Sequence, residues 1–439
     1  TKDPKRATNK IMLGKNFYYK EDVLLCDGIN IKNIVQKYST PVFIYSEQNI
    51  KENLHQIKKA MNGKQITVCY AVKANPALGI LKLAGAENLG FDVVSEGEMR
   101  RVLASSPGPK KIVFSGVGKT DEEIRFALKH EVFSLNVESL PELYRVNMVA
   151  KSLNVKAPVS IRINPDVNPD THPYIATGLR ENKFGLSVED GMNAYKTARS
   201  LPFIDIKGID CHIGSQILTL EPFAQAAEKV LSFIDQLMKE TGVVLSHINL
   251  GGGLGISYSD KEHPPSLEKF LSLMSDVVIN WYKKRGLNPP HLVFELGRSV
   301  VGNSGILVAK VLYLKKTKDS SGKNFAVVDA AMNDLIRPTL YNAYHEIVPV
   351  TSNKKTDSNT WEIVGPICES GDWLAKNREL RLLEGDLICF FSAGAYSSSM
   401  ASNYNSRRKP AEVIVDCDSS VREIVRRESY DELFNREIT

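Results

Sequence analysis

Short apolar runs alternate with amphipathic stretches along much of the chain. Between about residues 42 and 296 the runs have the length of buried strands, and the stretches between them have the period of a helix. We expect eight strands, over residues 66–72, 89–94, 111–115, 133–137, 159–164, 206–214, 247–250 and 292–296. Helices are expected over residues 95–103, 121–128, 139–153, 221–240 and 266–285. Eight strands with helical crossovers predict an α/β protein with a TIM-like (β/α)8 barrel, and an open doubly wound sheet is the alternative.

The pattern changes after residue 296. Strand-like runs predominate there, over residues 306–314, 325–329, 361–364, 386–391 and 411–416, and Val421–Phe434 is the one clear helical stretch. A chain of 439 residues is also longer than one hydrophobic core normally supports. We therefore predict two domains: a barrel over residues 42–296, and a mostly antiparallel β domain over residues 297–439 to which residues 1–41 contribute.

Composition and charge narrow the class of protein. The sequence is 43% hydrophobic and 24% charged, as in globular proteins, and its net charge of +5 is spread along the chain, which argues against a nucleic-acid partner. No apolar run is long enough to span a membrane, and the basic segment Lys2–Lys10 lacks the apolar run of a secretory signal. The chain does not begin with Met, so an upstream targeting segment is left open. We expect the protein to be located in the cytoplasm, or in a plastid if a transit peptide has been removed.

The six cysteines are scattered, with neither a CxxC pair nor zinc-site spacing, so no metal site is predicted. Five lie in apolar or strand-like runs and are predicted to be small core residues: Cys26, Cys69, Cys211, Cys389 and Cys417. Cys368 differs, because it lies in the turn-forming segment Gly365–Asp372. The set indicates a reducing compartment without structural disulfides.

Lys73 directly follows the apolar strand that ends at Val72. Apolar surroundings disfavour the ammonium form of a lysine and favour the neutral amine, which is a nucleophile for carbonyl groups. Taken alone, a strand-end lysine more often reaches into solvent. The interpretation therefore depends on what the other strand ends carry.

The ends of the other predicted strands carry polar residues and glycines: Asp92, Ser115, Asn136, Arg162, His212, Gly251–Gly253 and Glu295. In a barrel, the ends of parallel strands gather on the face that carries the active site. Bare backbone at Gly251–Gly253 can offer N–H groups to a phosphate, although glycine turns also occur for packing alone. Lysine for an imine, glycine turns for a phosphate, His212 to cover a ring and Glu295 to hold a ring nitrogen together indicate pyridoxal 5'-phosphate.

These segments and later ones resemble the alanine-racemase-like, fold type III pyridoxal-phosphate decarboxylases, and among them the diaminopimelate decarboxylases. The resemblance runs from about Pro41 to Pro410 and rests on an ordered series of motifs: Tyr70–Asn75, Phe91–Glu98, His212–Gln216, Gly251–Gly255, Met332–Pro338, Tyr341–His345, Cys368–Asp372, Gly394–Tyr396 and Ser402–Arg407. The sequence departs from the family pattern at two places. Leu296 stands where proline is usual, and Ser397–Ser399 replaces glycine and aromatic or apolar residues.

The resemblance implies roles for the matching residues. The cofactor would contact Lys73, Asp92, His212, Ser215, Gly252, Gly253, Glu295, Gly297, Arg298 and Tyr396. The substrate would contact Arg298, Arg337, Tyr341, Glu369 and Tyr396. Catalysis would rest on Lys73, which carries the cofactor, on His212, and on Cys368, which supplies the proton that replaces CO2. The resemblance also implies a head-to-tail homodimer in which the cysteine loop completes the partner's site.

The implied reaction converts meso-2,6-diaminopimelate into L-lysine and CO2. Ornithine, arginine and carboxynorspermidine are alternative substrates, but the pair Arg298 and Arg337 favours a substrate with two carboxylates. An inactive, partner-binding homologue is an alternative of another class, and the presence of both Lys73 and Cys368 argues against it. A small pyridoxal-phosphate carrier protein is excluded by the β domain, because those proteins end after the barrel.

Overall fold

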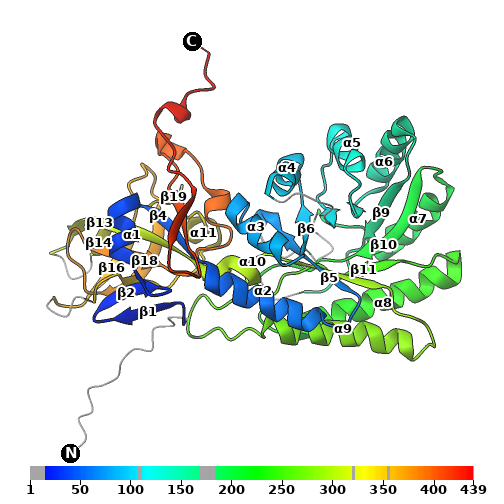
Figure 1. Cartoon of the computed structure of the whole chain (residues 1–439), viewed down its shortest axis with the longest axis horizontal. Coiled ribbons are helices and arrows are strands. Elements are labelled where there is room, and N and C mark those ends of the chain that lie inside the picture. The colour runs from blue at the N-terminus through cyan, green and yellow to red at the C-terminus, as the bar shows by residue number, and fades with distance from the viewer. Residues whose placement is uncertain are drawn as a thin grey trace, which may run out of the picture. The chain divides into compact units, whose positions relative to one another are not determined.

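The computed structural model describes residues 15–105, 111–168, 177, 183–318, 322–352 and 356–438 (Figure 1). The chain divides into two compact units. The barrel unit comprises Lys51–Ile256 and Pro264–Gly302, and the β unit comprises the described residues of Thr1–Ile50, Ser257–His263 and Asn303–Thr439. Among the described residues, no helix combines the length and the apolar composition needed to span a membrane.

Eight parallel strands close the barrel in chain order, as the sequence predicts. They are β5 (Ile66–Ala71), β6 (Gly90–Val93), β7 (Ile112–Phe114), β8 (Ser134–Val137), β9 (Ala157–Arg162), β10 (Ile204–Asp210), β11 (His247–Asn249) and β12 (His291–Leu296). The closing pair is β12 with β5, in which Phe294 lies opposite Val68. This pairing removes both sheet edges and excludes the open sheet.

Helices follow the strands and surround them (Figure 1). They are α3 (Leu78–Ala86), α4 (Glu96–Ser105), α5 (Asp121–Lys129), α6 (Leu140–Leu153), α7 (Val188–Ser200), α8 (Glu221–Thr241) and α9 (Leu267–Lys283). Thr120 begins α5 with a capping box, in which its hydroxyl accepts the Glu123 N–H and the Glu123 carboxylate accepts the Thr120 N–H. Gly242, at a φ of 71°, ends α8 with a left-handed residue. The five helices predicted from the sequence are all present.

The β unit is built on a nine-stranded sheet with a separate three-stranded sheet. The small sheet holds β1 (Phe17–Lys20), β2 (Val23–Cys26) and β3 (Ile29–Asn30), followed by α1 (Ile31–Tyr38). The large sheet holds β4 (Val42–Ser46), β13 (Gly305–Lys315), β14 (Phe325–Val328), β15 (Ile347–Pro349), β16 (Asn359–Val364), β17 (Trp373–Leu380), β18 (Leu387–Phe390), β19 (Ala411–Val415) and β20 (Val421–Val425). Most of its pairs are antiparallel, as predicted, and β14–β16 and β4–β19 are parallel.

The structure differs from the sequence-based expectations at several places. The domain bounds differ, because Ser257–His263 belong to the β unit and residues 297–302 belong to the barrel unit. β4 lies within the expected barrel range of 42–296 but pairs with β13 and β19 in the β unit. Val421–Phe434 is not a helix. Val421–Val425, which has a β-branched valine at each end, forms the strand β20 and pairs with β19. Within Val421–Phe434, helical geometry is limited to the turn Asp431–Leu433. Cys417 is exposed rather than a core residue, whereas the other four cysteines predicted to lie in the core are buried.

Candidate active site

Lys73 lies in the short helical turn Val72–Ala74 that directly follows β5. Its Nζ is 2.7 Å from Oδ2 of Asp92 on β6, and the lysine side chain is 35% exposed while that of Asp92 is fully buried. The ion pair stabilises the ammonium form, so the apolar strand does not by itself make Lys73 a neutral amine. The other Asp92 oxygen, Oδ1, is buried and has no hydrogen-bond partner among the described residues.

His212 follows β10 and is held by the glycine turn after β11. The Gly252 N–H donates to His212 Nδ1 over 3.1 Å, which places the ring proton of a neutral imidazole on Nε2. Burial, together with the charges of Arg162 and Lys73, lowers the pKa of His212 well below its usual value. The ring is therefore neutral and suited to stacking on another flat ring.

The glycines of this turn are required by packing within the barrel. A Cβ on Gly252 would lie 1.7 Å from the Glu295 carbonyl oxygen, and one on Gly253, whose φ is 103°, would lie 2.1 Å from the Gly214 oxygen. Packing alone thus explains the glycines, as the sequence allowed. Binding of phosphate by Gly252 and Gly253 stays a prediction.

Glu295, on β12, is buried next to other carboxylates. Its Oε1 accepts the Asn249 amide over 2.6 Å, and Asn249 Oδ1 accepts the Gly251 N–H over 2.9 Å. Burial raises the pKa of Glu295 well above its usual value, and the charges of Asp92 and Asp210 raise it further. A carboxyl in this setting ionises most readily when a cation is brought to it.

These observations fit pyridoxal phosphate. A protonated pyridine nitrogen is a cation of the kind that Glu295 requires, and the neutral ring of His212 can cover a planar cofactor. The buried Asp92 Oδ1 also leaves an acceptor for a polar group at the side of Lys73.

Arg298 begins the short helix α10 (Arg298–Val301), directly after Gly297. Its Nη2 and Nε donate to Ser215 Oγ over 3.0 and 3.3 Å, so two of the predicted residues meet. A Cβ on Gly297 would lie 2.8 Å from the Ala74 Cβ, in the turn that carries Lys73. Leu296, in place of the usual proline, is buried and continues the register of β12 against Tyr70 of β5.

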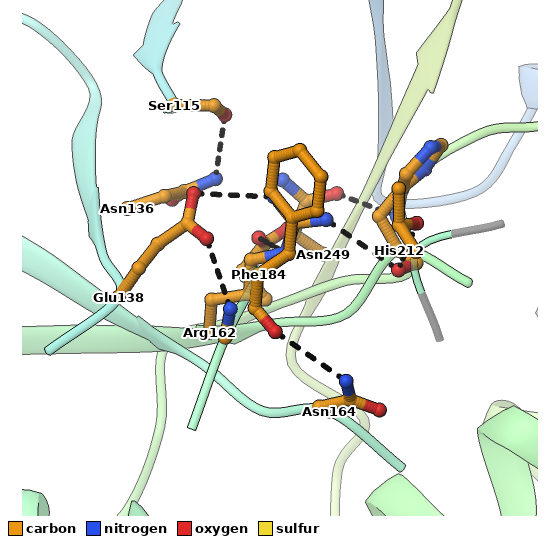
Figure 2. Close-up of polar contacts among 12 residues, drawn as sticks. Ser115, Asn136, Glu138, Arg162, Asn164, Phe184, His212 and Asn249 are labelled. Atoms are coloured by element: carbon orange, nitrogen blue, oxygen red, sulfur yellow. Dashed lines mark hydrogen bonds and ion pairs between the residues drawn. The ribbon is translucent and has the colours of Figure 1, made fainter. Parts of the chain in front are cut away.

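A buried ion-pair cluster lies at the ends of β8, β9 and β10. Arg162 Nη1 is 3.2 Å from Glu138 Oε1, and Arg162 Nε is 3.7 Å from Asp210 Oδ2. Figure 2 shows the contact between Arg162 and Glu138, with the Asn136 amide donating to Ser115 Oγ beside it.

The acidic members of this cluster were not predicted as site residues. Burial raises the pKa of Asp210 to about 7, although the charge of Arg162 opposes the shift. Glu98 was also missed: it accepts the Val94 N–H, and burial raises its pKa to about 7. These residues could have been found in the sequence as acidic residues at or just after an apolar run, as at Glu138 and Asp210.

The remaining predicted residues belong to the β unit: Arg337, Tyr341, Cys368, Glu369 and Tyr396. Arg337 and Tyr341 are the first and last residues of α11 (Arg337–Tyr341), and Arg337 is buried. Tyr396 has a left-handed backbone, with a φ of 53°.

Cys368 and Glu369 are exposed in the turn between β16 and β17. The Cys368 N–H donates to Asn405 Oδ1 over 2.8 Å. No role was predicted for Asn405 from the sequence. Its backbone is left-handed, with a φ of 55°.

Known proteins similar to this chain agree on one family. The family model for the pyridoxal-binding domain of pyridoxal-dependent decarboxylases matches residues 47–302. A protein of Vibrio cholerae named diaminopimelate decarboxylase is 46% identical over 401 residues, which is 91% of this chain and 93% of the relative.

Solved structures are similar over almost the whole chain. Diaminopimelate decarboxylase from Helicobacter pylori complexed with L-lysine has a TM-score of 0.85 and 40% identity, covering 92% of this chain and 98% of that one. The enzyme from M. jannaschii in co-complex with L-lysine has a TM-score of 0.90 and 37% identity, covering 97% of this chain and 98% of that one. The chain therefore belongs to the pyridoxal-dependent decarboxylases and, within them, to the diaminopimelate decarboxylase family.

Proposed function

We propose that this protein catalyses the pyridoxal-phosphate-dependent decarboxylation of meso-2,6-diaminopimelate to L-lysine and CO2. The observation that carries the proposal is the polar end of the barrel, where Lys73, paired with Asp92, lies in the same unit as the buried Glu295. In a member of this family, the barrel unit would hold the cofactor. The β unit would supply residues for substrate binding and proton transfer.

The barrel residues bind and orient the cofactor in this proposal. Lys73 holds it through the side-chain amine, His212 covers the ring, and Glu295 keeps the ring nitrogen protonated. The phosphate and the pyridine ring are held by Ser215, by Gly252 and Gly253, and by the turn at residues 295–298. When bound, pyridoxal phosphate supplies a conjugated ring that accepts the electron pair left behind when CO2 departs.

Residues of the β unit then act on the substrate. Arg337 and Tyr341, together with Arg298, bind the carboxylate that is not lost, because a guanidinium fork matches a carboxylate best. Glu369 contacts the distal amino group, and Tyr396 contacts both cofactor and substrate. The Cys368 thiol donates the proton that takes the place of CO2, which is general acid catalysis.

The direct test compares substrates. Purified protein with pyridoxal phosphate should release CO2 from meso-diaminopimelate, and far less from ornithine, arginine or carboxynorspermidine. Arg337→Lys should raise KM for diaminopimelate sharply, since lysine cannot reproduce bidentate geometry. A wild-type preference for ornithine would contradict the proposal.

We further propose a homodimer with shared sites, acting in the cytoplasm. The exposure of Cys368 at a turn supports its availability to a second chain, and six free cysteines suit a reducing compartment. Lys73→Ala and Cys368→Ala proteins should each be nearly inactive. After subunit exchange half of the dimers are hybrids with one complete site, so about a quarter of wild-type activity should return. Exchange without recovery would place Cys368 in its own chain's site, or outside the chemistry.

A further inference from the structure

Arg337 lies in a buried polar cluster of the β unit that the predicted roles do not explain. The arginine is 4% exposed, and His345, only a few residues later in the chain, is fully buried. The Arg337 Nη1 atom is 2.8 Å from His345 Nε2. The His345 Nδ1 atom is 2.7 Å from the main-chain oxygen of Phe391. His345 therefore connects the guanidinium to the rigid backbone just beyond β18.

The two contacts fix the protonation of the His345 ring. A carbonyl oxygen only accepts hydrogen bonds, so Nδ1 must carry the proton that is donated to Phe391. A guanidinium only donates, so Nε2 must offer its lone pair to Arg337. A doubly protonated ring would place a second cation and an N–H group against the guanidinium. The arrangement thus requires the neutral Nδ1–H tautomer.

Tyr258 supports both side chains from another side. The Arg337 guanidinium carbon lies 4.3 Å from the centroid of the Tyr258 ring, which is cation–π geometry. The rings of Tyr258 and His345 meet edge to face, with centroids 5.3 Å apart. The Arg378 Nη2 atom also donates to the main-chain oxygen of His345 over 3.0 Å. The Tyr258 ring packs against the face of the Arg337 guanidinium, and His345 Nε2 accepts a hydrogen bond from its Nη1. These two contacts together give the guanidinium one preferred orientation.

We propose that His345 is a positioning residue that determines specificity for a substrate carrying a carboxylate distant from the reacting carbon. It acts through Arg337, whose orientation it fixes before the substrate binds, so that binding requires less ordering of the arginine. This inference rests on the proposed function, because it takes Arg337 as the group that binds that carboxylate. The imidazole itself does not contact the reacting atoms.

A matched pair of ligands isolates this effect. Loss of one carboxylate from diaminopimelate leaves L-lysine, which keeps the other. Cadaverine has the same chain and both amines but no carboxylate. The difference between their dissociation constants therefore reports the carboxylate contact. Both can be measured by calorimetry on the protein loaded with pyridoxal phosphate, independently of catalysis.

Two variants separate the contacts of His345. In His345→Asn, the amide reaches the position of Nδ1, keeps the bond to Phe391 and loses the bond to Arg337. In His345→Gln, the amide oxygen reaches the position of Nε2 and can still accept from Arg337. We expect His345→Asn to weaken L-lysine binding about 10-fold to 100-fold, as for a lost hydrogen bond to a charged group. KM for diaminopimelate should rise with little change in kcat, and cadaverine binding should stay within about twofold.

The conservative variant and two controls decide among the outcomes. His345→Gln should recover most of the L-lysine affinity, and His55→Ala, at an exposed position of α2 (Glu47–Met61), should change nothing. Equal weakening of both ligands in His345→Asn, or no weakening of L-lysine, would overturn the inference. If Arg337→Lys leaves L-lysine binding unchanged, the proposed role of Arg337 fails instead. If the wild type releases no CO2 from diaminopimelate, the proposed function fails independently of His345.

Discussion

Replacing Arg162 by methionine removes the positive charge from the buried cluster at the ends of β8, β9 and β10. The Arg162 side chain is 8% exposed, and those of Glu138 and Asp210 are each 2% exposed. Methionine fills much of the same volume but offers no donor. Both carboxylates then stay buried without their cation, and the Glu138 carboxylate keeps its bond from the Gly185 N–H, at 2.9 Å.

The expected loss is large and depends on pH. Removing one partner of a buried ion pair costs about 3–5 kcal/mol, out of about 5–15 kcal/mol of total stability for a typical protein. The pKa of Asp210 is already raised to about 7, so its ionisation opposes folding once pH exceeds the unfolded pKa of about 4. In the wild type this penalty stops growing near pH 7. Without Arg162 the pKa rises further, and the penalty grows above pH 7 by up to about 1.4 kcal/mol per pH unit.

Urea unfolding followed by circular dichroism measures this loss. We expect the free energy of unfolding of Arg162→Met to fall below that of the wild type by more at about pH 8.5 than at about pH 6. Arg162→Met combined with Glu138→Gln should recover part of the loss, because one buried carboxylate is neutralised. Arg145→Met is the matched control: its pair with Asp121 spans 3.0 Å but is about half exposed, and should contribute at most about 1 kcal/mol. The same loss at both pH values, or a loss no larger than that of the control, would refute the reasoning.

Three further predictions concern catalysis. Glu295→Gln should keep the cofactor bound but lower kcat about 100-fold, because the ring nitrogen loses its ionic partner; an unchanged kcat with chemistry rate-limiting would exclude that role. Borohydride treatment of the loaded protein should fix the cofactor to the peptide containing Lys73, and a label on another lysine would defeat the assignment. Asn405→Ala should lower kcat and speed alkylation of Cys368, because its loop loses the 2.8 Å bond, while exposed Cys417 should react as before. Unchanged alkylation of Cys368 would show that Asn405 does not order the loop.

The hydrophobic pattern was sufficient to predict the barrel, because its strands are short apolar runs and five of them are followed by a stretch with the period of a helix. The helices α3 and α7, which follow β5 and β9, were not predicted. Strand ends carry information for the same reason: parallel strands finish on one face, so residues such as Lys73 and Asp92 were expected to meet and do so at 2.7 Å. Glu295 is buried at the end of its strand, but its role as the partner of a cofactor ring nitrogen stays a prediction.

Which strands pair within the β unit could not be predicted from the sequence. All residues of β4 are buried, so its pattern is that of a barrel strand, yet its hydrogen bonds go to β13 and β19 in the other unit. Val421–Val425 has a composition compatible with either helix or strand. It forms a strand because it pairs with the edge of β19, a contact that the local sequence does not reveal.

The sequence by itself determined the order of the strands and the residue types at their ends, because both follow from local periodicity. The tertiary structure decided which polar groups share a buried environment, because that depends on distances between residues far apart in the chain. Glu138 and Asp210 share one environment because both contact Arg162. His345 has a defined tautomer because its ring nitrogens contact Arg337 and the main-chain oxygen of Phe391. Protonation states within the fold are set by such neighbours, which no local pattern encodes.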